Sequence, residues 1–271
     1  MPIGGFMPVA LACISRTGTQ NMRRIVSALP AAALMVATAG IAHADHKVYS
    51  PTVEEGVLEI EARMHRTIDS NPEKDDGQAH KYELGYGLTS WWHTAVFAKL
   101  EKEPEADMRY SATAWENIFQ LTAPSDYWIG TGLYLEYSRG AHRGGPDELE
   151  GKLLLETQRL APFVFTTNLI LNKEFRDNAE TGTGFEYAVR VRYPWLRALE
   201  LNVEAYGEPG KIGHFTTSAE QEHVVGPVLS GKFNIPGITG VFGYEAGYLF
   251  GVTPASPSGT VKALLEYEVP L

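Results

Sequence analysis

The chain has 271 residues, 44% of them hydrophobic and 21% charged, and its formal net charge is −10. This acidic balance argues against nucleic acid as a partner, because phosphate binding requires a basic surface. The one cysteine, Cys13, lies in a segment that we expect to be removed, so the mature protein is predicted to have neither disulfides nor thiol chemistry.

Residues 1–44 are predicted to be a leader with a cleaved signal peptide. Met22-Arg23-Arg24 begins a positive stretch, residues 25–41 are mostly apolar, and Ala42-His43-Ala44 is a small-x-small cleavage site. Met22 is the expected true start, and residues 45–271 form the expected mature chain. Loss of the three basic leader residues changes the formal net charge from −10 to −13. No later apolar run approaches the length of about 18 residues that a membrane helix needs.

The mature chain reads as about twelve segments in which apolar and polar residues alternate, as strands with one apolar and one polar face require. In chain order the segments cover residues 58–65, 81–89, 93–101, 108–121, 127–138, 148–156, 163–172, 185–193, 199–206, 222–234, 238–250 and 261–271. The fourth is irregular, because Glu116 follows Ala112 and Ala114 on the apolar phase. Either a bulge shifts the register there, or Glu116 lies at a membrane edge. The tenth segment is weak and contains Pro227.

The connections between these segments alternate between short and long. Short ones lie near residues 89–91, 122–126, 159–162, 194–197 and 235–237, and longer polar ones at 67–79, 139–147, 172–184 and 207–221. This rhythm is typical of an up-and-down outer-membrane barrel, whose short turns face the periplasm together with both chain ends. Aromatic residues cluster at the short turns, where we expect a membrane-interface girdle made of Trp91, Trp92, Tyr127, Trp128, Tyr193 and Trp195. A soluble sandwich or lipocalin-like barrel would also alternate, but with its apolar side chains inside.

The last segment has the clearest alternation, and it resembles the C-terminal insertion signal of outer-membrane barrels. Its apolar face carries Leu265, Tyr267, Val269 and Leu271, although a terminal aromatic residue is usual. Residues 116–120 through 134–137 resemble an uncharacterised group of proteobacterial outer-membrane barrel proteins. The resemblance covers most of the mature chain and implies an all-β, closed antiparallel barrel of about twelve strands in a Gram-negative outer membrane. It implies no catalytic motif.

Charged residues fall on the phase that such a barrel would turn toward its lumen. The lumen-lining candidates are Glu59, Glu61, Arg63, Lys81, Glu83, Lys99, Glu136, Lys152, Glu186, Arg190, Arg192 and Glu204. Acidic residues outnumber basic ones on this phase, which favours a narrow, weakly cation-preferring pore or solute-binding cavity. The same charges could instead pair across strands in a packed lumen and stabilise a structural membrane component.

A lipid-modifying enzyme of the lipase or deacylase type, with its site at the extracellular rim, is the alternative function. The candidate side chains near the predicted outer loops are His65, His80, His142, His214, His223, Ser70 and Ser218. No local motif ties any of these serines to a histidine, as a catalytic triad would need. No catalytic residue, cofactor or metal site is therefore predicted. The expected partners are outer-membrane lipid and lipopolysaccharide, with barrel-insertion machinery and periplasmic chaperones acting transiently.

Overall fold

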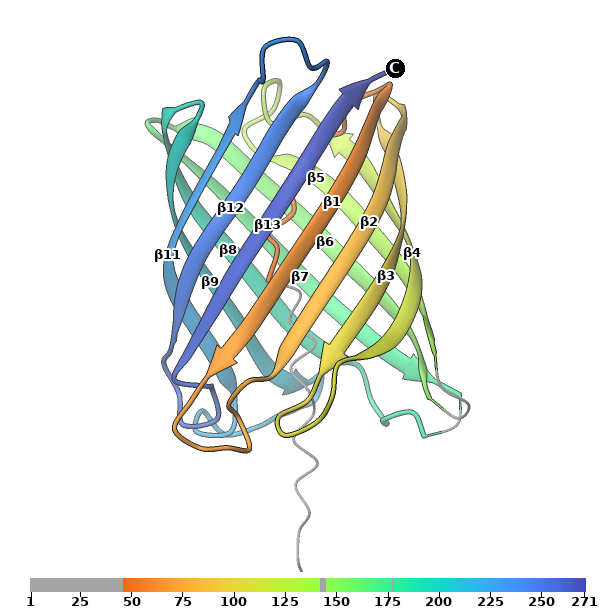
Figure 1. Ribbon diagram of the computed structural model, residues 1–271, viewed down its shortest axis with the longest axis vertical. Helices are drawn as coiled ribbons and strands as arrows, with labels where there is room; N and C mark the ends of the chain where they lie inside the picture. Colours follow the sequence, from red (N-terminus) through yellow and green to blue (C-terminus); the bar gives the residue numbers. More distant parts are fainter. Residues whose placement is uncertain (1–45, 142–144, 177) are drawn as a thin grey trace, which may run out of the picture. The chain divides into compact units, whose positions relative to one another are not determined.

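The computed structural model describes residues 46–141, 145–176 and 178–271, and the predicted signal peptide lies outside them. Within this part of the chain, twelve long strands and one two-residue strand form a single antiparallel sheet (Figure 1). The strands are β1 Val57–Ile68, β2 Gln78–Thr89, β3 Trp92–Lys102, β4 Arg109–Thr122, β5 Gly130–Gly140, β6 Asp147–Leu160, β7 Phe163–Phe175, β8 Gly184–Leu196, β9 Leu199–Lys211, β10 His214–Phe215, β11 Glu222–Phe233, β12 Val241–Gly251 and β13 Gly259–Pro270.

The sheet closes on itself because the first long strand pairs with the last. Strand β1 is antiparallel to β13 from Val57 opposite Pro270 to Ile68 opposite Gly259, and β8 pairs with β9 on the far side. The short β10 only extends β9 within the loop that precedes β11. Closure removes every free strand edge, which a sheet surrounded by lipid requires. The predicted closed barrel of twelve antiparallel strands is therefore confirmed.

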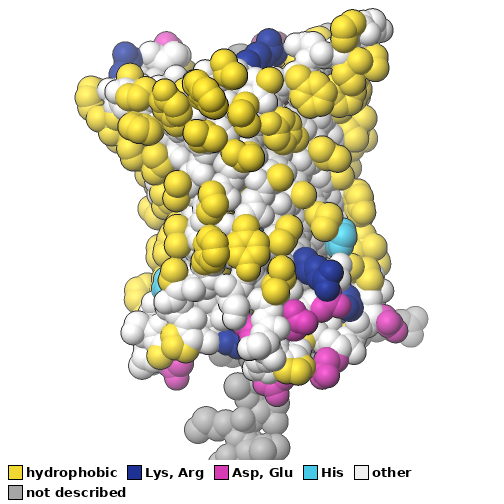
Figure 2. Space-filling model, turned by 60° about the vertical axis from the view of Figure 1, so that its left-hand side comes forward, with side chains coloured by type: hydrophobic (Ala, Val, Ile, Leu, Met, Phe, Trp, Pro, Cys, Tyr) yellow, Lys and Arg dark blue, Asp and Glu magenta, His cyan; other side chains and the backbone are white. Residues whose placement is uncertain are grey.

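The barrel wall has its apolar side chains outside and its charged side chains inside. On β1, Ile60 is 48% exposed while its neighbour Glu61 is 2% exposed, and on β13 Leu265 is 67% exposed while Lys262 is 3% exposed. Figure 2 shows hydrophobic side chains over the middle and upper wall, with most of the charged ones near the lower end. This arrangement excludes the soluble-barrel interpretation, because such a barrel would expose its charges and bury its leucines. No helix in the described part of the chain is long and apolar enough to cross a membrane.

The two ends of the barrel carry different connections (Figure 1). The end that holds the C-terminus has three two-residue turns, at 90–91, 161–162 and 197–198, together with the loops 123–129 and 234–240. The described loop residues at the opposite end are 69–77, 103–108, 141, 145–146, 176, 178–183, 212–213, 216–221 and 252–258. The predicted alternation of turns and loops is present, although the loops 123–129 and 234–240 are not shorter than several of those at the other end.

Strand β4 resolves the irregular fourth segment. Ala112, Ala114 and Glu116 all face the lumen, with exposures of 9%, 3% and 1%. The first of the two alternatives, a bulge that shifts the register, is confirmed: Lys99 lies opposite Ala112, and the next residue of β3 lies opposite Tyr110. The even-numbered residues therefore face outward at Tyr110, which is 44% exposed, and inward from Ala112 onward. The second alternative, Glu116 at a membrane edge, is wrong. Small side chains can face inward here because another segment of the chain, described next, fills the lumen beside them.

The segment that fills the lumen is residues 46–56, which precede β1 and which we call the plug segment. The prediction had included this stretch in the barrel, but the structure threads it through the lumen (red and orange inside the barrel in Figure 1). Val48 and Tyr49 are 4% and 2% exposed, and Pro51 is fully buried. Two apolar clusters form around the segment. Val48 contacts a cluster of Ile170, Ala188, Tyr206, Val224, Val228 and Leu249, whereas Tyr49 contacts Tyr134, Leu154 and Ile118.

The weak alternation of the tenth segment is also explained by the plug segment in the lumen. It forms strand β11, with the Pro227 side chain exposed on the outer wall. The pairing of β11 with β9 is continuous, whereas its pairing with β12 is interrupted at Gly226 and Pro227, as expected for a residue without a backbone N–H. Val224 and Val228 face inward, at 6% and 1% exposure, against the plug segment. The polarity alternation is weak in β11 because its inward side chains contact apolar atoms of the chain itself and not water.

Candidate functional site

The lumen is the candidate functional site, and all twelve predicted lumen-lining residues lie on the inward phase of their strands. Glu61, Arg63, Lys81, Glu83, Lys152, Glu186 and Glu204 are buried, and Glu59, Lys99, Glu136, Arg190 and Arg192 are partly buried. Burying charges at these positions requires partners, because an isolated buried charge is very costly. Their role in transport stays a prediction.

One network of charges ties β8 and β9 to β12 and β13. Arg190 contacts Glu204 at 2.7 Å and Glu245 at 2.5 Å. Lys262 Nζ lies 2.7 Å from Glu204 and 3.1 Å from Glu245. Because β11 and β12 separate β9 from β13 in the sheet, the contact between Lys262 and Glu204 passes through the lumen, whereas Glu245 lies on the adjacent strand β12. Tyr206 completes the network by donating a hydrogen bond to Glu204 at 2.6 Å. These pairs fit the packed-lumen interpretation of the charges.

Tyr49 of the plug segment connects opposite walls of the barrel. Its backbone N–H donates to Asn168 Oδ1 at 2.8 Å, and Asn168 Nδ2 donates to its backbone carbonyl at 2.9 Å. Its hydroxyl accepts a hydrogen bond from Arg63 at 2.9 Å and lies 3.3 Å from Glu116. Arg63 is on β1 and Asn168 is on β7, which are six steps apart in the twelve-strand ring. One residue therefore spans the lumen between diametrically opposed strands.

Aromatic and cationic contacts hold the Tyr49 ring in place. The ring lies 4.8 Å from the ring of Tyr134, and Lys152 Nζ lies 4.4 Å from the centre of each of the two rings. Such cation–π contacts gain strength where water is excluded. Below and above Tyr49, the plug segment is held by an ion pair from Lys47 to Glu61 at 2.6 Å and by a hydrogen bond from Val53 N–H to Gln120 at 2.8 Å.

A missing side chain on the wall makes room for the plug segment. A Cβ atom at Gly132 on β5 would lie 3.0 Å from Pro51 Cβ and 3.1 Å from Pro51 Cα. On β2, a Cβ atom at Gly87 would lie 1.9 Å from the carbonyl oxygen of Glu54. The wall and the segment therefore fit each other closely, and the segment cannot shift without rearranging these contacts.

Sequence reasoning missed the plug segment and most of the residues that hold it. Asn168, Tyr134 and Glu116 were not among the lumen candidates, and residues 46–56 were not singled out. A signal was present in the apolar residues on the lumen phase, such as Leu154, Ile170 and Val228, which would have no reason to face a water-filled channel. What fills the space beside them could not be read from that pattern.

The predicted aromatic girdle residues all lie at the end of the barrel with the C-terminus. Trp91, Tyr127, Trp128 and Trp195 are 52%, 57%, 65% and 57% exposed, and Trp92 and Tyr193 are partly exposed there. The predicted insertion-signal residues lie on the outer face of β13: Leu265 and Leu271 are 67% and 78% exposed, and Tyr267 and Val269 are partly exposed. Their membrane roles stay predictions.

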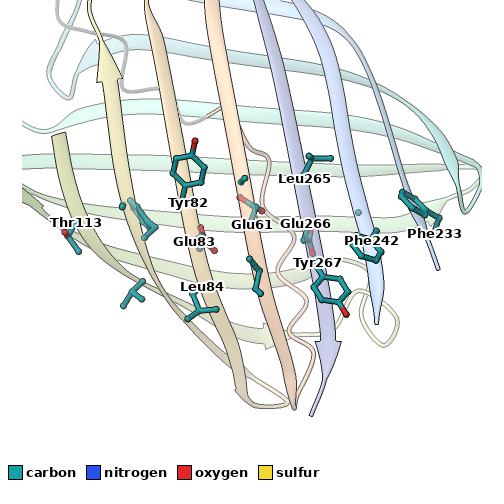
Figure 3. Close-up of a pocket in the computed structure, with 16 residues that line it drawn as sticks. Glu61, Tyr82, Glu83, Leu84, Thr113, Phe233, Phe242, Leu265, Glu266 and Tyr267 are labelled. Carbon is teal, nitrogen blue, oxygen red and sulfur yellow. The ribbon is translucent and has the colours of Figure 1, made fainter. Parts of the chain in front are cut away.

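An apolar depression of about 700 Å³ lies on the wall between β11 and β4, with lining residues from β11, β12, β13, β1, β2, β3 and β4 (Figure 3). Exposed side chains line it, among them Tyr82, Leu84 and Leu265, while Glu61 and Glu83 come from the inward phase of the same strands.

The candidate enzyme residues do not come together as the alternative function requires. The ring nitrogens of His223 contact the Tyr187 hydroxyl at 3.0 Å and Gln221 at 2.9 Å, and His80 contacts Gln78. The rings of His65 and His46 lie 4.5 Å apart. Ser70, Ser218 and His214 are exposed, and His142 lies outside the described residues. The ring of neither His80 nor His223 is bonded to a serine, and the Ser256 hydroxyl contacts His223 only at its backbone N–H and carbonyl, each at 2.8 Å. These contacts do not favour a lipase site.

Two groups of side chains in the described lumen could hold a metal ion. Glu83, His93 and Glu116 form one, and Glu59, Glu61 and Glu266 form the other; in each group the potential ligand atoms lie within 4.8 Å of one another. The second group is purely acidic and lies beside Lys47, which is 2.6 Å from Glu61 and 3.8 Å from Glu59.

No protein-family model matches the chain, and no curated protein matches it in sequence. Among solved structures, it is similar to the KdgM porin in complex with disordered oligogalacturonate, with 9% identity, 79% of this chain and 99% of that chain covered, and a TM-score of 0.49. The KdgM porin without that ligand matches at 10% identity, with the same coverage and a TM-score of 0.48. OmpT, an outer-membrane protein of Vibrio cholerae in its trimer form, matches at 9% identity over 78% of this chain and 98% of that one, with a TM-score of 0.30. What this barrel does must be read from its own side chains.

Proposed function

We propose that the protein is an integral outer-membrane barrel that forms a pore closed by its own N-terminal segment. Small solutes would pass only when residues 46–56 leave the lumen. The observation that carries the proposal is Tyr49, which bridges β1 and β7 through Arg63 and Asn168 at the centre of the closed sheet. A segment that connects opposite walls obstructs any path along the axis.

The surface of the wall supports the membrane part of this proposal. Apolar residues such as Ile60, Leu84 and Leu265 are 48%, 50% and 67% exposed along strands whose inward neighbours are charged. In water this arrangement would place hydrocarbon outside and ions inside at a large cost, whereas in a bilayer it is the stable solution. Lipid and lipopolysaccharide would then surround the wall, and a signal peptide would deliver the chain to the periplasm for insertion.

The way the plug segment is held supports displacement as a route to opening. It is attached to the wall by hydrogen bonds, ion pairs and packing, and it has no strand pairing of its own before residue 57. Contacts of this kind can exchange for water, whereas the strand ladders cannot open without losing the barrel. Once the segment is displaced, the lumen would carry more carboxylates than cationic side chains, which favours cations over anions.

Single-channel recording in planar bilayers tests the proposal. The natural protein should be silent or open only briefly, because the plug segment occupies the lumen. Tyr49→Ala should give longer, cation-preferring openings, since the substitution removes the bridge between the walls. Tyr82→Ala is the matched control, because Tyr82 is 52% exposed on the outer wall and touches no part of the plug segment. A steady current through the natural protein would refute closure, and silence of a correctly inserted Tyr49→Ala variant would refute the pore.

A further inference from the structure

Three chemically suited side chains converge in the lumen from neighbouring strands. Glu83 lies on β2, His93 on β3 and Glu116 on β4, and one ligand atom from each lies within 4.8 Å of the other two. In the sheet, Ala95 of β3 is opposite both Gly85 and Glu116. Because Ala95 and Gly85 are small, the longer side chains around them can lean together above the wall.

His93 is the unpartnered member of this group. It is 9% exposed and, within the described residues, makes no hydrogen bond or ion pair. Its ring occupies space that any other residue at position 85 would fill, because a Cβ atom on Gly85 would lie 2.5 Å from His93 Nε2. A largely buried imidazole that makes no hydrogen bond leaves a ring nitrogen available as a metal ligand.

The two carboxylates beside His93 are only loosely paired with cations. Arg63 Nη2 lies 3.3 Å from Glu83, and Lys81 Nζ lies 3.9 Å from Glu116. Elsewhere in the same lumen, Lys47–Glu61 and Lys262–Glu204 close to 2.6 and 2.7 Å. Glu83 and Glu116 therefore keep lone pairs available. The hydroxyls of Tyr134 and Tyr49 both donate to Oε2 of Glu116, at 2.9 and 3.3 Å, and would orient that carboxylate while leaving its Oε1 to a ligand.

We propose that Glu83, His93 and Glu116 bind one divalent transition-metal ion inside the barrel. An imidazole nitrogen with two carboxylate oxygens is a ligand set that suits Zn²⁺ or Mn²⁺ better than the all-oxygen preference of Ca²⁺ or Mg²⁺. Two carboxylates also offset the charge of the ion. Metal–ligand distances of about 2.0–2.2 Å require ligand atoms roughly 3.3 Å apart, so the side chains need to close by no more than about 1.5 Å, which rotation of the two glutamates can supply. The site does not depend on pore opening.

Metal titration of the purified, detergent-solubilised protein tests this inference, with Zn²⁺ by calorimetry and Mn²⁺ by electron paramagnetic resonance. One ion should bind per barrel. His93→Ala and Glu116→Gln should each weaken binding by more than the 10- to 100-fold that loss of an outer-shell partner causes. His80→Ala is the matched control, because His80 is on the opposite face of β2 from Glu83 and should leave the affinity unchanged.

Folding of each variant is checked by the mobility shift between unheated and boiled samples, and Glu116→Gln decides the matter if His93→Ala fails to insert. Absence of Zn²⁺ and Mn²⁺ binding by the natural protein would overturn the inference. So would equal binding by the natural protein and either lumen variant, or loss of binding in His80→Ala. If the Tyr49→Ala variant conducts no current but the natural protein binds one metal ion, the pore proposal fails and the metal site stands. If the Tyr49→Ala variant conducts but the natural protein binds no metal, only the metal site is overturned.

Discussion

Replacement of Asn168 by alanine should release the plug segment. The Asn168 side chain is fully buried and makes two hydrogen bonds, at 2.8 and 2.9 Å, with the backbone N–H and carbonyl of Tyr49. Its loss leaves one buried donor and one buried acceptor, each costing about 1–3 kcal/mol. Because water can enter the polar lumen and partly satisfy these two groups, we take the lower end of their combined cost. A cost of about 2 kcal/mol lowers the ratio of closed to open protein roughly 30-fold.

Two assays report this ratio independently. Single-channel recording gives the open fraction, and limited trypsin digestion gives the access to Lys47, whose side chain is 16% exposed when it is paired with Glu61. Asn172→Ala is the control, because Asn172 is on the same face of β7 but donates to Glu186 and not to the plug segment. If folded Asn168→Ala protein keeps both the open fraction and the trypsin resistance of the natural protein, the plug segment is not held as described.

Three further predictions concern the wall and the loops. Gly87→Ala should displace the plug segment and raise the open fraction, because the new Cβ would lie 1.9 Å from the Glu54 carbonyl oxygen. Gly151→Ala should not, because the atom nearest to its new Cβ is 3.8 Å away. Equal currents through the two variants would contradict this prediction. Leu265→Arg should lower the free energy of unfolding in lipid vesicles by about 2–4 kcal/mol, because Leu265 lies in the middle of β13 on the outer face. Urea titration measures this change. An unchanged urea midpoint would argue against a lipid-facing β13. The pKa of Asp69 is lowered by hydrogen bonds from Asn71 N–H and from Ser258, so its carboxylate stabilises the β12–β13 loop above the usual aspartate pKa, and this stabilisation is lost as pH falls through the lowered pKa. Hydrogen exchange in that loop should therefore rise only in strong acid in the natural protein. In Asp69→Asn it should be raised already at neutral pH.

The wall of the barrel could be derived from residue order because a bilayer constrains every outward position in the same way. Hydrocarbon outside demands an apolar residue at each second position, so Leu265 and Val261 on β13 reveal their side without knowledge of any neighbour. Turn residues mark where each strand ends. Twelve strands, their antiparallel order and the inward phase of residues such as Glu61 and Lys262 follow from these local rules.

The lumen obeys no such repeating rule. An inward residue can face water, an ion partner or another part of the chain, and the alternation is the same in all three cases. Ala112 and Ala114 belong to the apolar phase of the fourth segment, yet they face the lumen of the barrel. Glu116 could be explained only once its neighbours were known, since Tyr134 on β5 and Tyr49 of the plug segment both lie within hydrogen-bonding reach of it.

Tertiary structure therefore decided what occupies the interior. Tyr49 and Asn168 are 119 positions apart, and Glu83, His93 and Glu116 come from three strands; only closure of the sheet brings these groups together. Periodicity describes the medium on each side of a strand, because that medium is uniform along its length. It cannot describe contacts between a particular pair of side chains across the lumen, because those depend on strand register, curvature and the path of residues 46–56.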